Sequence, residues 1–250
     1  MTAIVPHLSW YNPSGRGASS IRIFAIADLH LSFGAVKPMD IFGEAWERHP
    51  ERLQAAWNEA VTADDIVLVA GDISWAMREI DALPDIAFLA GLPGRKILLK
   101  GNHDYWWSTR ARVQRLLPSD HVLQTNAIEL ADVTVVGTRG WELPGGDRLT
   151  DDDRRLYGRE MERLRLSLEQ GARTGKPLLA MMHYPPLPAD GSPTPFSALL
   201  EQFAVQRCVY GHLHGGAHRN RIEGVVRSVE YHLVAGDFLA FRPKLIVPGA

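Results

Sequence analysis

Six short apolar runs divide the chain of 250 residues, and each is followed by a polar or glycine-containing segment. Short runs of apolar and β-branched residues are typical of strands that are buried on both faces of a parallel sheet. We therefore predict strands at residues 21–27, 66–71, 96–101, 133–137, 177–182 and 207–211.

The segments between several of these runs have helical character. We predict helices at about 44–63, 78–91, 106–117, 151–173 and 194–204. Strands that alternate with helices favour an α/β fold with a largely parallel sheet. The last segments, "IEGVVRSV" and "YHLVAGDFLAFRPKLIV", leave little room for helices and predict further strands, in a meander or in a second sheet.

Composition favours one globular domain over residues 1–250. Apolar residues make up 46% of the chain and charged residues 22%, which is ordinary for a soluble protein and needs no membrane. The formal net charge is −2, with both signs interleaved along the chain. The chain therefore lacks the basic surface that dominates nucleic-acid affinity, and a nucleic-acid partner has no support.

Two features indicate a cytoplasmic protein. Residues 1–20 lack a basic region followed by a long apolar stretch, so they predict a surface arm or a short strand rather than a signal peptide. Cys208 is the single cysteine and cannot form an intramolecular disulfide, which fits a reducing compartment. Its apolar neighbours predict a small buried side chain.

Side chains that can bind metals follow five of the six predicted strands. In open α/β sheets ligands bind beyond the carboxyl ends of the strands, so these side chains are expected to converge there. Any one of them alone has a commoner structural role, an aspartate as a helix N-cap for example, but together they favour a site. The residues are Asp28, His30, Asp72, Asn102, His103, Asp104, His183, His212 and His214.

The motifs "DLH", "GD", "GNHD", "H" and "GHLH", in this order, resemble the five-part signature of the calcineurin-like metallophosphoesterase superfamily. The resemblance implies an α/β fold of two packed mixed β-sheets flanked by helices, with metals in a cleft at the strand ends. It also implies two metal sites that share Asp72. The first would be held by Asp28, His30, Asp72 and His214, and the second by Asp72, Asn102, His183 and His212.

The ligand types indicate a catalytic site. Imidazole, carboxylate and amide groups without thiolates suit manganese, iron or zinc. Two such ions about 3.5–4 Å apart can share a hydroxide, and they can clamp a phosphoryl group during in-line attack. With the two aspartates and one hydroxide, the site keeps a single positive charge toward an anionic substrate. We expect two divalent metal cofactors and a phosphate-ester substrate, most simply a small molecule.

Three further residues have predicted roles near the metals. In the family the residue that matches His103 contacts the phosphate and the leaving group, and a histidine can donate a proton there. Asp104 is expected to fix the tautomer of His103. Arg139 can pair with a substrate phosphate, although a surface ion pair is the commoner role for such an arginine. The five prolines of residues 183–195 predict a stiff rim.

The segment 154–165 and the tryptophans beside the motifs have simpler interpretations. The arginines of this segment alternate with Glu160 and Glu162, which predicts the solvated face of a helix. Trp75, Trp106 and Trp107 are expected to pack rather than to stack on bases.

Sequence differences from other members of the superfamily narrow the range of expected substrates. Phosphoprotein phosphatases of the superfamily have an Asp-Arg pair after "GD" and an arginine before "GNHE", whereas this chain reads "GDISWAM" and "KGNHD". The lipid A pathway hydrolases have an arginine where this chain has His103. The group that remains is the bacterial-type phosphohydrolases and phosphodiesterases.

A nuclease or a cyclic-nucleotide phosphodiesterase is the alternative enzyme, and a non-catalytic scaffold is disfavoured because no ligand residue is missing. Monoester or diester preference and the oligomeric state stay open.

Overall fold

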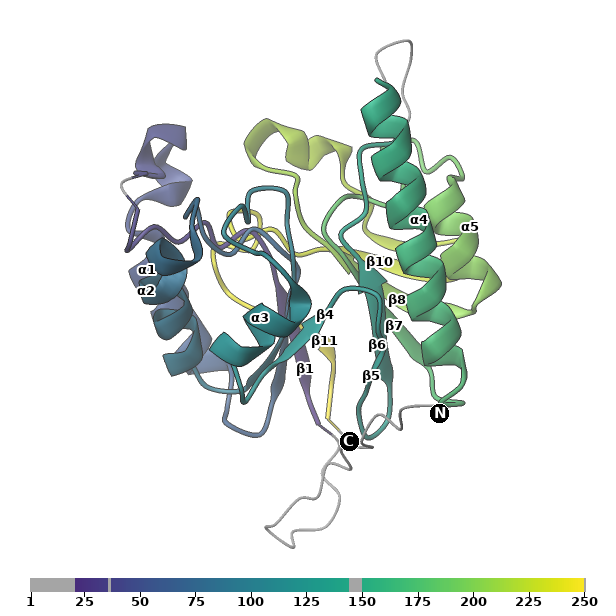
Figure 1. Ribbon diagram of the computed structural model, residues 1–250, viewed down its shortest axis with the longest axis horizontal. Helices are drawn as coiled ribbons and strands as arrows, with labels where there is room; N and C mark the ends of the chain where they lie inside the picture. Colours follow the sequence, from purple (N-terminus) through teal and green to yellow (C-terminus); the bar gives the residue numbers. More distant parts are fainter. Residues whose placement is uncertain (1–20, 36, 144–149, 250) are drawn as a thin grey trace, which may run out of the picture.

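The computed structural model describes residues 21–35, 37–143 and 150–249; the arm or strand predicted within residues 1–20 lies outside them. Two β-sheets pack against each other, with helices on their outer faces (Figure 1). The first sheet has five strands in the order β11-β1-β2-β3-β4, and the second has six in the order β5-β6-β7-β8-β10-β9. This arrangement confirms the predicted α/β sandwich.

The first sheet brings three predicted site segments together. Its strands are β1 (Ile23–Ile26), β2 (Ile66–Val69), β3 (Arg95–Leu99), β4 (His121–Leu123) and β11 (Lys244–Val247). β1 to β4 run parallel, and β11 pairs antiparallel with β1. The register places Ile26 beside Val69 and Val69 beside Leu98. The carboxyl ends of these three strands are therefore level, and the loops that follow them lie side by side.

The second sheet supplies the remaining site segments. Its strands are β5 (Ile128–Glu129), β6 (Thr134–Thr138), β7 (Leu178–Met182), β8 (Val205–Tyr210), β9 (Gly224–Val226) and β10 (Val229–Leu233). The four central strands run parallel, and β5 and β9 pair antiparallel at the edges. The strands predicted in the tail are present, but they are divided between the sheets: β9 and β10 join the second, whereas β11 returns to the first.

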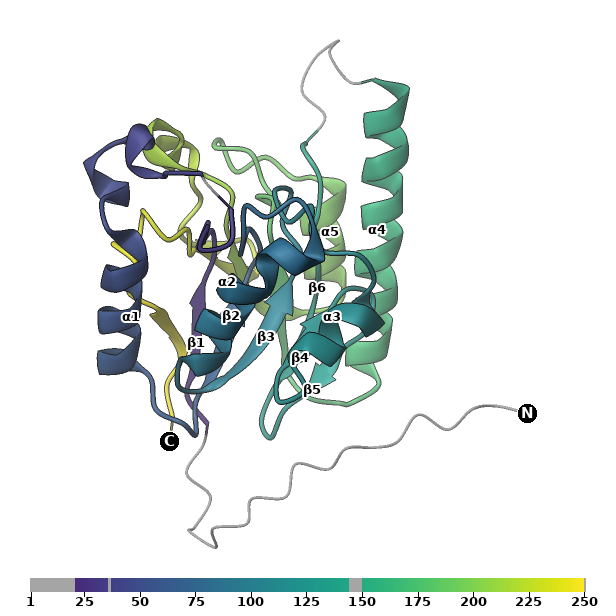
Figure 2. The same ribbon diagram turned by 60° about the vertical axis from the view of Figure 1, so that its left-hand side comes forward.

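Five α-helices cover the described sheets at the predicted places. α1 (His49–Ala60), α2 (Glu79–Gly91) and α3 (Arg110–Leu116) lie on the first sheet, and α4 (Asp151–Ala172) and α5 (Pro195–Gln202) lie on the second (Figure 2). Short 3-10 turns lie at η1 (Asp40–Phe42), η2 (Glu44–Trp46) and η3 (Gly215–Asn220). α1 begins later than predicted because Arg48 adopts a left-handed conformation with φ 48°. α3 begins after Thr109, whose side chain accepts a hydrogen bond from the backbone N–H of Arg112.

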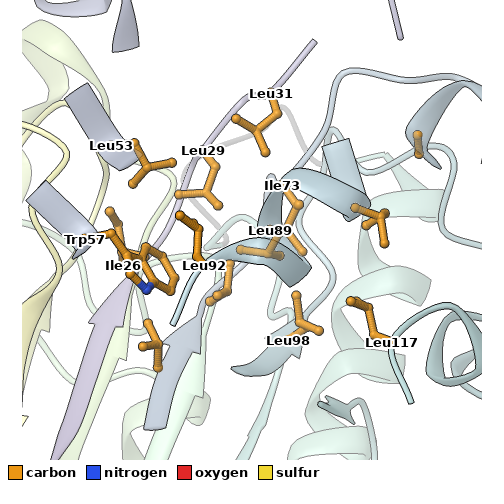
Figure 3. Close-up of a cluster of buried hydrophobic side chains, with 14 of the residues drawn as sticks. Ile26, Leu29, Leu31, Leu53, Trp57, Ile73, Leu89, Leu92, Leu98 and Leu117 are labelled. Carbon is orange, nitrogen blue, oxygen red and sulfur yellow. The ribbon is translucent and has the colours of Figure 1, made fainter. Parts of the chain in front are cut away.

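The strands β1 and β2 are fully buried, and β3 is buried after its first residue, which explains their continuous apolar runs. Phe24 and Ile26 belong to the core beneath the helices, and Ile23 and Ala25 belong to the core between the sheets. Trp57 of α1 packs in the core beneath the helices, among leucine and isoleucine side chains (Figure 3). Full burial of such a side chain contributes roughly 1.5–3 kcal/mol. The strands are therefore firm mounts for the polar residues at their ends.

Candidate metal centre

The seven predicted metal ligands meet at the carboxyl ends of five strands. Asp28 and His30 follow β1, Asp72 follows β2, and Asn102 follows β3; the others follow β7 and β8. His183 is the first residue after β7, and His212 and His214 come after β8. Segments up to 186 residues apart in sequence numbering, from Asp28 to His214, thus contribute to one cluster, as the strand-end pattern predicted.

Four of these seven residues have a left-handed backbone. The φ angles are 59° for Asp28, 43° for His30, 54° for Asp72 and 74° for His212. Positive φ is uncommon for residues other than glycine and costs about 1–3 kcal/mol, and such strain gathers at functional sites. The loops turn sharply after each strand, which directs these side chains toward one another.

The first group of ligand atoms surrounds His214 Nε2. It lies 3.4 Å from His30 Nε2 and 3.3 Å from Asp28 Oδ1. One ligand atom from each of these three residues lies within 4.8 Å of the others. Convergent imidazole nitrogens and a buried carboxylate are a donor set that fits a divalent cation.

The second group forms around the side-chain oxygen of Asn102. This Oδ1 lies 2.6 Å from His183 Nε2 and 2.9 Å from His212 Nδ1. Asp72 Oδ2 lies 3.5 Å from His183 Nε2 and 3.7 Å from His30 Nε2, so Asp72 stands between the two groups. Asp28 also has a ligand atom within 4.8 Å of those of Asp72 and His183. The residues therefore fit two neighbouring ions better than one.

Hydrogen bonds fix the orientation of two histidines. His183 Nδ1 lies 2.9 Å from the carbonyl oxygen of Ala70, so it donates there and Nε2 keeps its lone pair for the centre. His214 Nδ1 lies 2.9 Å from Asp237 Oδ1, which leaves His214 Nε2 facing Asp28. Each histidine thus presents one defined nitrogen to the cluster.

Asp237 is a site residue that sequence reasoning missed. It follows β10, and its side chain is 2% exposed. A signal was present, because residues 68–72 and 233–237 both read "LVAGD". The first copy ends at Asp72 and the second at Asp237. The same five-residue sequence therefore ends in a site aspartate in both sheets, once in a predicted ligand and once in the partner of a predicted ligand.

The expected hydrogen bond between Asp104 and His103 is not formed. His103 Nδ1 has no hydrogen-bond partner among the described residues. The fully buried Asp104 carboxylate is used instead by five N–H donors, which belong to the loops after β2 and β3. The donors are the backbone N–H groups of Asp72, Ile73, Ser74 and Gly101 and the indole N–H of Trp106. Asp104 therefore ties two loops of the site together.

His103 borders the cluster and is half-buried. Its backbone N–H donates to Asp72 Oδ1 at 2.8 Å, and its ring centre lies 4.4 Å from that of Trp75. Burial, followed by the charges of His183 and Lys37, lowers the pKa of His103 to about 4. The imidazole is therefore neutral at pH 7.

Trp75 packs beneath this part of the site, as expected of a tryptophan beside the motifs. Its ring stacks on His30 at 4.6 Å. Lys37 Nζ lies 3.2 Å from the Trp75 ring centre, and its charge acts on His103. Lys37 was not a predicted site residue, and nothing in its local sequence marks it. It supplies a positive charge at the edge of the cluster.

Burial and neighbouring charges shift the pKa values of the cluster in opposite directions. Burial opposes the charged form of His214, but Asp28 and Asp237 outweigh it and raise the pKa of His214 to about 10. Burial raises the pKa of Asp72 to about 7. Burial, followed by the charge of His183, lowers the pKa of His212 to about 3. Without a bound metal, His214 is therefore protonated at neutral pH, and Asp72 is partly protonated.

The side chain of Arg139 points away from the predicted metal ligands, toward Glu160 and Trp141. The guanidinium lies 3.8 Å from Glu160 and 4.6 Å from the Trp141 ring centre. Its contact with the cluster is made by the backbone: the carbonyl oxygen accepts hydrogen bonds from the N–H groups of His183 and Tyr184. The side chain is 16% exposed, so it is not a surface ion pair either.

No helix in the described ranges is long and apolar enough to cross a membrane.

Known proteins match this chain in sequence. The calcineurin-like phosphoesterase family matches residues 21–216. The Gene 66 protein of Mycobacterium phage L5 is 32% identical over 78 residues, which are 31% of this chain and 37% of that protein. The Gene 66 protein of Mycobacterium phage D29 is 36% identical over 84 residues, or 33% and 40% of the two chains. The matched segments span about two fifths of these phage proteins, 37% and 40% of their lengths.

The fold also matches a solved structure. Phosphopantetheinyl hydrolase (PptH) from Mycobacterium tuberculosis superposes with a TM-score of 0.57 and 17% sequence identity. The match covers 92% of this chain and 97% of that one. At this identity the likeness shows a shared fold.

Proposed function

Because the chain belongs to the calcineurin-like phosphoesterase family, we propose that it hydrolyses phosphate esters with the help of two divalent metal ions. The position of Asp72 supports this proposal most directly. Its Oδ2 lies within 3.7 Å of His30 Nε2 and within 3.5 Å of His183 Nε2, so one carboxylate reaches both groups of ligand atoms. All seven ligands are present, which opposes a non-catalytic scaffold.

The proposed ligand sets follow these two groups. When bound, the ions supply Lewis acidity and activate a water for attack on phosphorus. Nitrogen and oxygen ligands without thiolates suit manganese, iron or zinc. One ion would be held by Asp28, His30, Asp72 and His214, and the other by Asp72, Asn102, His183 and His212.

The chain's other residues hold and orient the reacting groups. Asp237 and the Ala70 carbonyl fix two ligand histidines, and the neutral amide of Asn102 leaves the site positively charged. The cation of Lys37 adds to the attraction for a phosphate. His103 is neutral at pH 7 before substrate binds. A phosphate dianion beside it would raise its pKa, and His103 would then donate a proton toward the leaving group.

We further propose that the substrate is a small phosphate monoester or diester. We also place the protein in the cytoplasm as one domain. Cys208 is buried and forms no disulfide within the described residues, which agrees with a reducing compartment. The two sheets share a core in which Ile23 and Leu179 take part.

Hydrolysis of p-nitrophenyl phosphate and of its bis ester tests the proposal. The purified chain should release p-nitrophenolate with manganese present and stop when a chelator removes the metal. Asp72→Asn should lower both bound metal and rate, whereas Asp132→Asn, at an exposed aspartate between β5 and β6, should change neither. Full turnover in a verified metal-free sample would contradict the proposal.

A further inference from the structure

A polar cavity lies beside the metal centre, and we call it the basic pocket. Its volume is about 160 Å³, several times the ~30 Å³ that one water occupies. Its lining residues come from the carboxyl ends of β3 and β4, from Arg139 after β6, and from α4, the helix that covers the second sheet (Figure 1). Neither His103 nor a predicted metal ligand lines it. Its charged residues are Lys100, Arg139, Arg159, Glu160 and Arg163.

Positive charge is in excess in the basic pocket, since four cations share one carboxylate. Glu160 is fully buried and is already engaged: it accepts a hydrogen bond from Arg163 at 2.6 Å and another from Thr138 Oγ1 at 2.5 Å. Arg139 lies 3.8 Å from it, beyond hydrogen-bond distance. Glu160 therefore compensates Arg163 and only weakly compensates Arg139.

The other cations have unused donors. Arg139 Nε is buried and has no hydrogen-bond partner among the described residues. Lys100 Nζ makes a single hydrogen bond, to the carbonyl oxygen of Trp107 at 2.9 Å. The side chain of Arg159 is exposed and makes no hydrogen bond or ion pair with another described residue. Unfilled donors on a largely buried guanidinium such as that of Arg139 are unfavourable, and the part of this side chain that is still exposed can reach an acceptor from outside the chain.

A purely structural ion-pair network does not explain this arrangement. Nearer the start of α4, arginines form ion pairs with aspartates one helical turn away. Arg154 pairs with Asp151, and Arg155 pairs with Asp152. Arg159 faces the pocket without such a partner. The predicted solvated face of this helix is thus wrong at Glu160, which is buried, whereas Arg159 is exposed as predicted and Arg163 is half-buried.

We infer that the basic pocket binds the phosphate group of a small anionic ligand at a place separate from the metal centre. Guanidinium groups match the oxygens of phosphate with paired N–H donors, and lysine adds a point charge. The ligand is free phosphate or a phosphate monoester, which present the same dianion to the pocket. The inference does not depend on the proposed hydrolase function, because no metal ligand takes part.

Equilibrium dialysis of inorganic phosphate against the full chain tests the inference. The metal-loaded chain should bind phosphate at two sites, one at the metals and one in the basic pocket, and a chelator should remove only the first. Arg159→Gln should weaken the chelator-resistant binding at least threefold, and Arg139→Gln should abolish it. Arg155→Gln is the matched control on α4, and its binding should equal that of the wild type.

Two results would overturn the inference: no phosphate binding that survives chelation while the circular dichroism stays native, or surviving binding that is equal in all four proteins. If chelation unfolds the chain, the metal-loaded Arg139→Gln protein decides, since it should lose one of the two sites. Competition between p-nitrophenyl phosphate and bound inorganic phosphate in the chelated protein distinguishes a phosphate monoester from free phosphate as the ligand. Equal displacement indicates a monoester ligand, and weak displacement indicates free phosphate; both require the pocket to bind.

Discussion

His214 Nδ1 lies 2.9 Å from Asp237 Oδ1, which joins a residue after β8 to one after β10. The second Asp237 oxygen accepts the backbone N–H of Gly215 at 2.9 Å. Asp237 thus fixes both the ring and the main chain around a predicted metal ligand. Carboxylates that orient a ligand histidine in this way typically change metal affinity about 10- to 100-fold when removed.

Asp237→Asn should therefore lower the affinity for the ion that His214 holds by about 10- to 100-fold. The amide keeps the shape of the side chain but removes the charge that helps to raise the pKa of His214. Competition with a coloured chelator measures the affinity, and Asp132→Asn is the control at an exposed site. An unchanged affinity in Asp237→Asn would show that the contact does not serve the metal.

Metal binding should release protons at pH 7. The pKa of His214 is about 10, so His214 is protonated at pH 7, and metal binding at Nε2 requires that proton to leave. Asp72, with a pKa of about 7, releases a further fraction, which grows as pH falls below 7. Apparent affinity should therefore rise with pH. Calorimetry in two buffers of different ionisation enthalpy measures the release, and equal heats in both buffers would contradict this account.

His103→Ala should keep near-normal metal content and lose about 10²–10⁴ in turnover. The loss should be larger with alkyl esters than with p-nitrophenyl phosphate, because an alkoxide needs a proton when it leaves and p-nitrophenolate does not. Metal analysis and turnover on both ester types decide this. Loss of metal would make His103 a ligand, and an equal loss on both esters would indicate electrostatic stabilisation instead.

Asp104→Asn should destabilise the fold by about 3 kcal/mol, because one of the two oxygens that accept N–H groups is replaced by a donor. Urea unfolding with the Asp132→Asn control measures this difference. If Asp104 acted only on His103, stability would be unchanged and activity alone would fall. That outcome is the opposite of the one expected from its five hydrogen bonds.

The strand ends could be predicted because burial on both faces leaves a continuous apolar run in the sequence, and the polar residue after it is conspicuous. The same logic fails for β4 and β5, which have three and two residues and leave no pattern. Asp237 was missed because its "GD" lies in the tail, which was interpreted only as further strands, although residues 233–237 repeat the "LVAGD" of residues 68–72.

Contacts between distant elements could not be predicted from local patterns. In the sequence Asp104 is next to His103, but in the fold its carboxylate turns to the backbone of the loop after β2. Glu160 lies among arginines on a helix. Periodicity alone does not show that its carboxylate is buried and accepts a hydrogen bond from Thr138 of β6. Such positions depend on which surfaces pack together.

Activity measured against bound metal tests the central claim most directly. Chelator-treated, folded chain is titrated with manganese while bound metal and hydrolysis of p-nitrophenyl phosphate are measured in the same samples. The account predicts no turnover before metal is added and a plateau when two ions are bound per chain. Turnover without bound metal, or a plateau at one ion per chain, would contradict the two-metal centre around Asp72.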